Sequence, residues 1–428
     1  MPIPSGSFPE AIEAVARRRE PTALPGGFPP VRSRAGREAR AMEPRPGEGA
    51  MDKGMIRRIF PIVAGTYIAM IPMEVAPFVI GAAVERGLSA GQAGWVGTAT
   101  IAFVAIASIC APPLIARLRF RQAMIGFACI EAAGYCGFAA AQGFALLLAM
   151  GSLAGCGAGG LLAGMAIRIA RTDDPDRTYG YVYAATGLGF ALLLFLFPII
   201  GAKFGTAAMF LFAGFIALAL SCLLRSLPAG FLHEEVEAGP AQPVDRWGVA
   251  LLVAAMIVAM PVYGGTYGFS ERKAVEIGLS SRDAGLALSC AMLMSIIGSS
   301  IVALVGTQRG RLLPMATVLL LASLAYLTVL GARSAPVYVA GTLIFGLMQL
   351  ALTSYFFGLA SALDRNGGVA ARLQGFSLIP YGLGTGLFGS LADGGSLARL
   401  AVPAAAANLV ALAIVLPVLV RQDRGRRA

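Results

Sequence analysis

Apolar residues along this chain occur in long runs separated by short polar segments. A helix of about 20 apolar residues crosses a hydrocarbon layer of about 30 Å, so runs of this length predict membrane spans. They lie near 59–83, 93–116, 122–141, 144–167, 178–201, 206–224, 247–269, 284–306, 312–332, 336–360, 373–392 and 400–420. The pattern therefore predicts an all-α integral membrane protein with twelve transmembrane helices.

One polar segment, 225–246, divides the predicted spans into two sets of six. It contains proline, glycine and charged residues and has no apolar period, which is typical of a linker. We interpret the chain as an N-terminal six-helix bundle, a cytoplasmic linker, a C-terminal six-helix bundle and a basic cytoplasmic tail, at 51–224, 225–246, 247–420 and 421–428.

The first 50 residues differ from the rest of the chain. Residues 1–50 are rich in Pro, Gly, Arg and Glu and have too few apolar residues to form a core. They are also too polar for a signal peptide. We expect a disordered tail or a misassigned start, with Met51 as a credible first residue.

Composition supports the membrane assignment, and charge predicts the orientation. Hydrophobic residues make up 57% of the chain and charged residues 13%, against about 25% charged residues in a soluble domain. With the N-terminus inside, nineteen lysines and arginines from residue 51 onward fall on the cytoplasmic side and seven on the outer side. Both termini are therefore expected in the cytoplasm. The net charge of +11 reflects this topology and implies no nucleic-acid partner.

Metal, cofactor and nucleotide chemistry have no signature in the sequence. The six cysteines lie in apolar spans without C-x-x-C spacing, and the only histidine, His233, lies in the linker. A phosphate-binding G-x-x-x-x-G-K-[ST] loop is absent from the sequence. We predict no metal, no cofactor and no enzymatic activity.

An internal repeat relates the two sets of spans. Residues 85–94 read ERGLSAGQAG and residues 276–285 read EIGLSSRDAG, and a fainter repeat relates 178–189 to 373–384. Such repeats indicate two six-helix halves of common ancestry, arranged as a parallel repeat.

With this repeat, six plus six spans and a long central loop, the chain resembles the major facilitator superfamily of secondary transporters over about 51–425. The family's loop motif, a glycine followed by Asp-Arg-x-Gly-Arg-Arg, is degenerate here. Arg117 and Arg121 match it after the second span, and Gly306, Arg309 and Arg311 match it after the eighth. The resemblance implies gating loops at these arginines. Gly151 replaces the fourth-span arginine of the family's drug exporters, which favours an importer.

Glu74, in the stretch PMEVAP, is the carboxylate most deeply placed in the first span. A charge in hydrocarbon costs at least a few kcal/mol, so this group must face a water-filled cavity, pair with a cation or be protonated. Tyr67 and Phe78 share its helical stripe, while Pro72 and Pro77 should interrupt the backbone ladder there. We predict a proton-coupling role for Glu74 and a substrate-binding role for Tyr67. The alternative is a carboxyl group that only bonds a neighbouring helix.

The seventh span carries a matching stripe of Tyr263, Tyr267 and Glu271. The resemblance implies that the first and seventh spans line a central cavity, so both tyrosines are candidate substrate contacts. Glu271 is a candidate proton-coupling residue or, equally, a gate charge near the outer end.

Other polar residues complete the candidate site. Glu131 stands midway along the third span, and coupling or a structural contact are equal alternatives for it. Gln349, Tyr355 and Tyr381 are candidate substrate contacts in the tenth and eleventh spans, although each could simply join helices. The spans carry no central arginine or lysine, which favours a neutral, weakly basic or aromatic solute over an anion.

Together these features predict a proton-coupled symporter for a small organic solute, working by alternating access. An Ala-, Gly- and Arg-rich composition indicates a bacterial inner membrane. The expected partners are the solute, protons and the lipid bilayer, and the protein is expected to act as a monomer. The alternatives are a proton-linked exporter and a non-transporting membrane receptor or subunit.

Overall fold

The computed structural model describes residues 53–172, 175–230, 244–305, 310–363 and 368–425. The predicted tail at 1–50 and most of the predicted linker at 225–246 lie outside this range. The elements are α3 Lys53–Glu74, α4 Ala76–Glu85, α5 Ala90–Arg117, α6 Phe120–Ala140, α7 Phe144–Ala170, α8 Pro175–Phe204, α9 Thr206–Ser221, η1 Cys222–Ser226, α10 Arg246–Gly268, α11 Ser270–Glu276, α12 Ser281–Val305, α13 Leu312–Leu330, α14 Ala335–Leu363, α15 Gly368–Ala392, η2 Leu397–Leu400 and α16 Ala401–Gly425.

The described chain is helical and suited to a membrane. Ten helices are long and apolar enough to cross one, and the pair α3 and α4 makes an eleventh if its two parts form one bent span. The remaining predicted span, 373–392, falls within α15, a helix of 25 residues that is not among these. Within the described residues, each predicted span therefore overlaps one helix or, for 59–83, 206–224 and 400–420, two consecutive helical segments. By composition and length, the protein is a multi-pass membrane protein.

The sequence repeat forms the same turn twice. Gly87 and Gly278 end their helices with φ of 87° and 85°, a conformation that favours glycine. Two residues later, Ser89 caps α5 together with Gln92, and Ser280 exchanges equivalent hydrogen bonds with Asp283 at the start of α12. The repeated Gly and Ser residues therefore specify a turn followed by the start of a helix.

Small residues bring α7 close to α5. A Cβ atom at Gly155 would overlap the Thr100 carbonyl oxygen, and one at Gly159 would overlap the Val104 carbonyl oxygen. Glycine spacing of four residues places both positions on one helix face. The glycine run in the fourth predicted span is therefore a packing surface.

Two helix pairs make the most extensive contacts between the first half (α3–α9) and the second half (α10–α16), and α4 also contacts α10 and α11. α5 packs along α15, and α8 packs along α12. Thr98 donates to the Gly382 carbonyl at 2.7 Å, Thr385 donates to the Gly94 carbonyl at 3.0 Å, and Ser289 donates to the Ala191 carbonyl at 2.7 Å. Direct hydrogen bonds therefore join both pairs.

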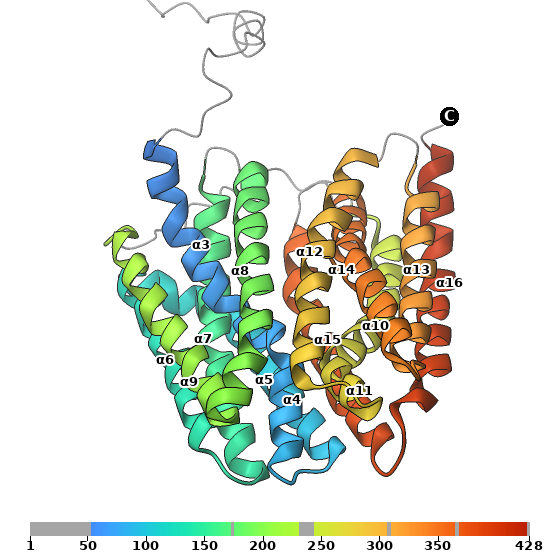
Figure 1. Ribbon diagram of the computed structural model, residues 1–428. Helices are drawn as coiled ribbons and strands as arrows, with labels where there is room; N and C mark the ends of the chain where they lie inside the picture. Colours follow the sequence, from blue (N-terminus) through green and yellow to red (C-terminus); the bar gives the residue numbers. More distant parts are fainter. Residues whose placement is uncertain (1–52, 173–174, 231–243, 306–309, 364–367, 426–428) are drawn as a thin grey trace, which may run out of the picture. The chain divides into compact units, whose positions relative to one another are not determined.

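Further contacts hold the halves together at the end where α4, α5 and α15 meet, which Figure 1 shows opposite the start of α3 and the end of α16. Asp393, just after α15, accepts from the Gly91 backbone N–H at 2.8 Å and from the Ser89 hydroxyl at 3.2 Å. One carboxylate of the second half thus caps a helix of the first. We call this the Asp393 clasp.

Replacing Asp393 by alanine should loosen this end. The loss of a helix cap costs about 1 kcal/mol. If the cap forms only when this end is closed, its loss shifts the ratio of the open to the closed conformation about fivefold. Spin labels at Glu85 and Arg282, in a cysteine-free background, should show a larger long-distance population by pulsed electron resonance. Asp283→Ala, which removes a cap within the second half alone, is the matched control. Equal distance distributions in both variants would contradict the clasp.

Candidate functional site

Glu74 lies where the first span breaks. α3 ends at Glu74, α4 begins at Ala76, and their axes differ by 44°. The Val75 N–H still donates to the Ile71 carbonyl at 2.9 Å, while Pro77 in the first turn of α4 has no N–H to offer. The predicted interruption of this span is confirmed. The Glu74 carboxylate therefore lies at the interruption between the two helical segments of this span.

A tyrosine from the second half reaches Glu74. The Tyr267 hydroxyl lies 3.1 Å from Glu74 Oε2 and 2.9 Å from the Glu74 carbonyl oxygen, and can donate to either. Both side chains are buried, with exposed fractions of 6% for Glu74 and 3% for Tyr267. The structure therefore joins the predicted stripes of the first and seventh spans through one hydrogen-bonding unit.

An aromatic cluster extends from Tyr267. Tyr263 lies edge-on to Tyr381 with ring centroids 5.1 Å apart, and Phe345 lies within 6.1 Å of both Tyr267 and Tyr263. These rings come from α10, α14 and α15, and aromatic pairs at such distances stabilise one another. Gln349, with an exposed fraction of 9%, is the amide one turn beyond Phe345 on α14.

The helix of the seventh predicted span ends just before Glu271. α10 ends at Gly268 and α11 begins at Ser270. Glu271, 2% exposed, accepts from the Ser281 hydroxyl at 2.6 Å through Oε1. Its Oε2 faces Gly81 of α4 and has no hydrogen-bond partner within the described chain. Glu271 therefore lies between the halves, one turn beyond Tyr267.

Two predicted contacts lie away from this cluster. The Tyr67 hydroxyl donates to the Gly189 carbonyl at 3.1 Å, and its ring stacks on Phe190 and lines an apolar pocket between α3, α8 and α9. Tyr355 is buried six residues beyond Gln349, about 9 Å further along the axis of α14.

Glu131 forms a separate buried position in the first half. It has no exposed surface, and neither carboxylate oxygen has a hydrogen-bond partner among the described residues. Its backbone and Cβ pack against Gly157 of α7, so it faces the α6–α7 interface. An unpaired charge is costly there.

Residues 60–389 match the sequence pattern of the Major Facilitator Superfamily. The chain belongs to this superfamily. The matched region includes the break beside Glu74 and both residues of the Glu74–Tyr267 contact.

Solved structures of this facilitator fold agree with the assignment. The human organic anion transporter MFSD10 is 17% identical, with a TM-score of 0.61, and the alignment covers 84% of this chain and 99% of that one. A proton dependent oligopeptide transporter is 14% identical, with a TM-score of 0.67 and coverages of 86% and 99%. The nucleoside transporter NupG is 10% identical, with a TM-score of 0.65 and coverages of 85% and 99%.

A comparison with curated protein sequences gave no match. The superfamily and these structures indicate a transporter rather than an enzyme.

The arginines of the predicted gating loops lie in different environments. Arg117 is exposed and Arg121 is half-buried, while Arg309 lies outside the described residues. Arg311 contacts the end of α16: its N–H donates to Asp423 at 2.9 Å and its guanidinium to Gln422 at 3.3 Å. The contacts described for Arg311 thus tie α13 to α16 within the second half.

Several residues that position the candidate site could not be recognised from the sequence pattern. Phe345 and Tyr326 belong to the aromatic cluster, yet apolar spans contain many such rings. Asp393 pairs with residues about 300 positions away. Its position after the eleventh span predicts a loop residue, and only the fold brings it to the start of α5.

Proposed function

We propose that this protein is a proton-coupled symporter. It would move a small organic solute by alternating access between the two six-helix bundles of a twelve-span protein. The supporting observation is the hydrogen bond between the Tyr267 hydroxyl and the Glu74 carboxylate, because it links a titratable group of one half to the other half. An ionised Glu74 accepts a charge-assisted bond from Tyr267. A protonated Glu74 has a proton to donate and so changes that link.

The same arrangement suggests how solute and proton act together. When the halves separate, the Glu74–Tyr267 contact would break, and the side chains of Glu74, Tyr267, Tyr263 and Tyr381 would line the opening. A solute with hydrogen-bonding and aromatic groups could replace the contacts that these rings make with one another. We therefore retain a neutral, weakly basic or aromatic solute as the substrate class.

Proton flux into proteoliposomes tests this proposal. Small amines, sugars, aromatic compounds and other organic solutes are added singly while a dye reports external pH. Alkalinisation outside with one solute class establishes symport and identifies the class. Acidification outside on adding a solute indicates exchange for protons and the proton-linked exporter. Absence of both proton flux and solute uptake across the panel would favour the non-transporting receptor.

We also propose an inner-membrane location with both termini in the cytoplasm. Its support is the predicted charge asymmetry and the location of the start of α3 and the end of α16 at the same end of the described chain (Figure 1). Cysteines introduced at 364–372 or 421–427 should react with an impermeant maleimide only in inside-out vesicles. Labelling in right-side-out vesicles would reverse the topology.

A further inference from the structure

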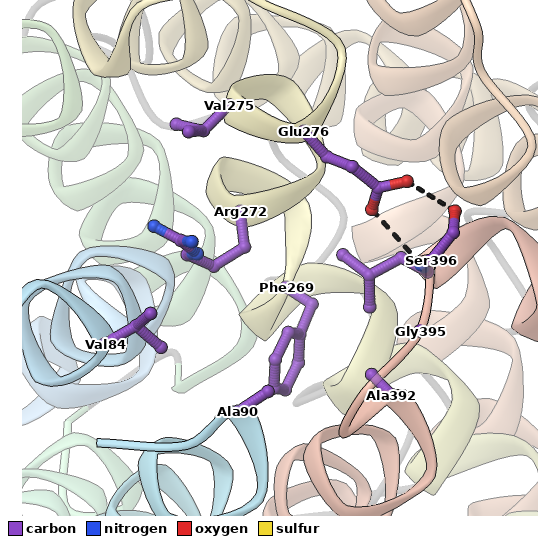
Figure 2. A pocket seen from close by; sticks show the side chains of 10 residues that line it. Val84, Ala90, Phe269, Arg272, Val275, Glu276, Ala392, Gly395 and Ser396 are labelled. Atoms are coloured by element: carbon purple, nitrogen blue, oxygen red, sulfur yellow. Dashed lines mark hydrogen bonds between the residues drawn. The ribbon is translucent and has the colours of Figure 1, made fainter. Parts of the chain in front are cut away.

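A pocket of about 380 Å³ lies beside the Asp393 clasp, away from Glu74 and the aromatic cluster. Figure 2 shows it between Val84 and Ala90 of the first half and α11 and the end of α15 in the second. Its lining includes Val84, Phe269, Arg272, Val275, Glu276 and Ser396. This volume falls within the range of small-molecule sites, about 300–1,000 Å³.

Both carboxylate oxygens of Glu276, the acidic residue in this pocket, accept hydrogen bonds from the protein. Glu276 accepts from the Ser396 hydroxyl and from Lys273 Nζ through Oε1, and from the Leu397 N–H at 3.1 Å through Oε2. Burial alone would raise the pKa of Glu276, but these donors hold it below its usual value. Its charge is therefore compensated by the protein itself.

Arg272 is the cation of the pocket, and the neighbouring Glu271 carboxylate attracts its charge without a hydrogen bond between them. Among the described residues it has no hydrogen bond or ion pair. Its sequence neighbour Glu271 is directed toward Ser281 and Gly81, and in Figure 2 the guanidinium points away from Glu276. A half-buried guanidinium thus borders a cavity whose other walls are mostly apolar.

We propose that this pocket binds a small organic carboxylate, with the carboxylate on Arg272 and a short apolar body between Val84, Val275 and Phe269. The planar guanidinium offers paired donors that fit a carboxylate, and the apolar walls favour a carboxylate with an apolar body over a hydrated inorganic anion. The ligand would contact both halves at once, so its binding would stabilise the conformation closed at this end.

Calorimetric titration of the purified full chain in neutral detergent tests this site. Benzoate should bind, and the isosteric neutral amide benzamide should bind at least about tenfold more weakly. Arg272→Gln should weaken benzoate binding by a similar factor, and Arg272→Lys by less. Arg282→Gln, which removes an exposed charge outside the pocket, is the matched control. Unchanged thermal unfolding shows that each variant is folded.

Other results would overturn the proposal. Equal binding of benzoate and benzamide, or of benzoate by wild type and Arg272→Gln, would exclude the guanidinium contact. Inorganic phosphate binding as tightly as benzoate would exclude selection for an apolar body. Loss of benzoate binding in phosphatidylglycerol nanodiscs, with retention in phosphatidylcholine nanodiscs, would assign the pocket to a lipid headgroup.

The site does not depend on the proposed transport mechanism. Glu74 is not among the residues that line this pocket, so Glu74→Gln should retain benzoate binding even if it abolishes proton coupling. The two proposals can therefore fail separately.

Discussion

Glu74→Gln should abolish solute accumulation driven by a proton gradient. With one coupled proton, a gradient of one pH unit supplies about 1.4 kcal/mol, which supports about tenfold accumulation. Glutamine keeps the shape and can still accept from Tyr267, but it cannot bind and release a proton. Uptake into proteoliposomes with an acidic exterior should therefore stop at the external concentration, while exchange of labelled for unlabelled solute persists.

Two further variants sharpen this experiment. Glu85→Gln removes an exposed carboxylate at the end of α4 and should leave accumulation unchanged. Tyr267→Phe removes the hydroxyl that donates to Glu74 and should reduce accumulation while proton binding by Glu74 persists. Accumulation by Glu74→Gln equal to that of wild type would eliminate the proposed proton role.

Gly384→Ala should strongly destabilise the protein. A Cβ atom at this position of α15 would overlap the carbonyl oxygen of Pro261 in α10, and backbone atoms cannot move aside as a flexible side chain can. Overpacking of this kind typically costs about 1–3 kcal/mol, occasionally more. The strain would fall between α10, which carries Tyr263 and Tyr267, and α15, which carries Tyr381.

Gly358→Ala is the control for this substitution. A Cβ atom at Gly358 of α14 meets nothing within 4 Å, and alanine is favoured over glycine in a helix by about 1 kcal/mol. Thermal unfolding in detergent should therefore show a lower midpoint, or no folded protein, for Gly384→Ala and an unchanged or higher midpoint for Gly358→Ala. Equal midpoints would show that α10 and α15 can separate freely.

Hydropathy predicted the helices well because burial in lipid requires long apolar runs with internally satisfied backbones. The 206–224 span, for example, corresponds to α9 and η1. Local chemistry was also readable: Pro72 and Pro77 predicted the break beside Glu74, and the repeated Gly and Ser letters mark two equivalent turns.

Partner choice within the candidate site was harder to predict. Tyr67 and Glu74 share a stripe in sequence, yet the Tyr67 hydroxyl bonds the Gly189 carbonyl of α8. Lys273 counts as an outer-side cation in the sequence, but it is 1% exposed and paired with Glu276. Helical periodicity gives the face on which a side chain stands, while its partner depends on how neighbouring helices are rotated and spaced.

The sequence by itself determined the class of protein, the helices, the break at Glu74 and the turns, because these depend on solvent and on backbone chemistry within a few residues. Only the tertiary structure decided that Tyr267 meets Glu74, that Asp393 caps α5 and that Arg272 borders a pocket. The first two contacts join residues 193 and 302 positions apart, and the third depends on which side chains the packing leaves beside the pocket. No local pattern records such a contact, since packing of the two halves creates it.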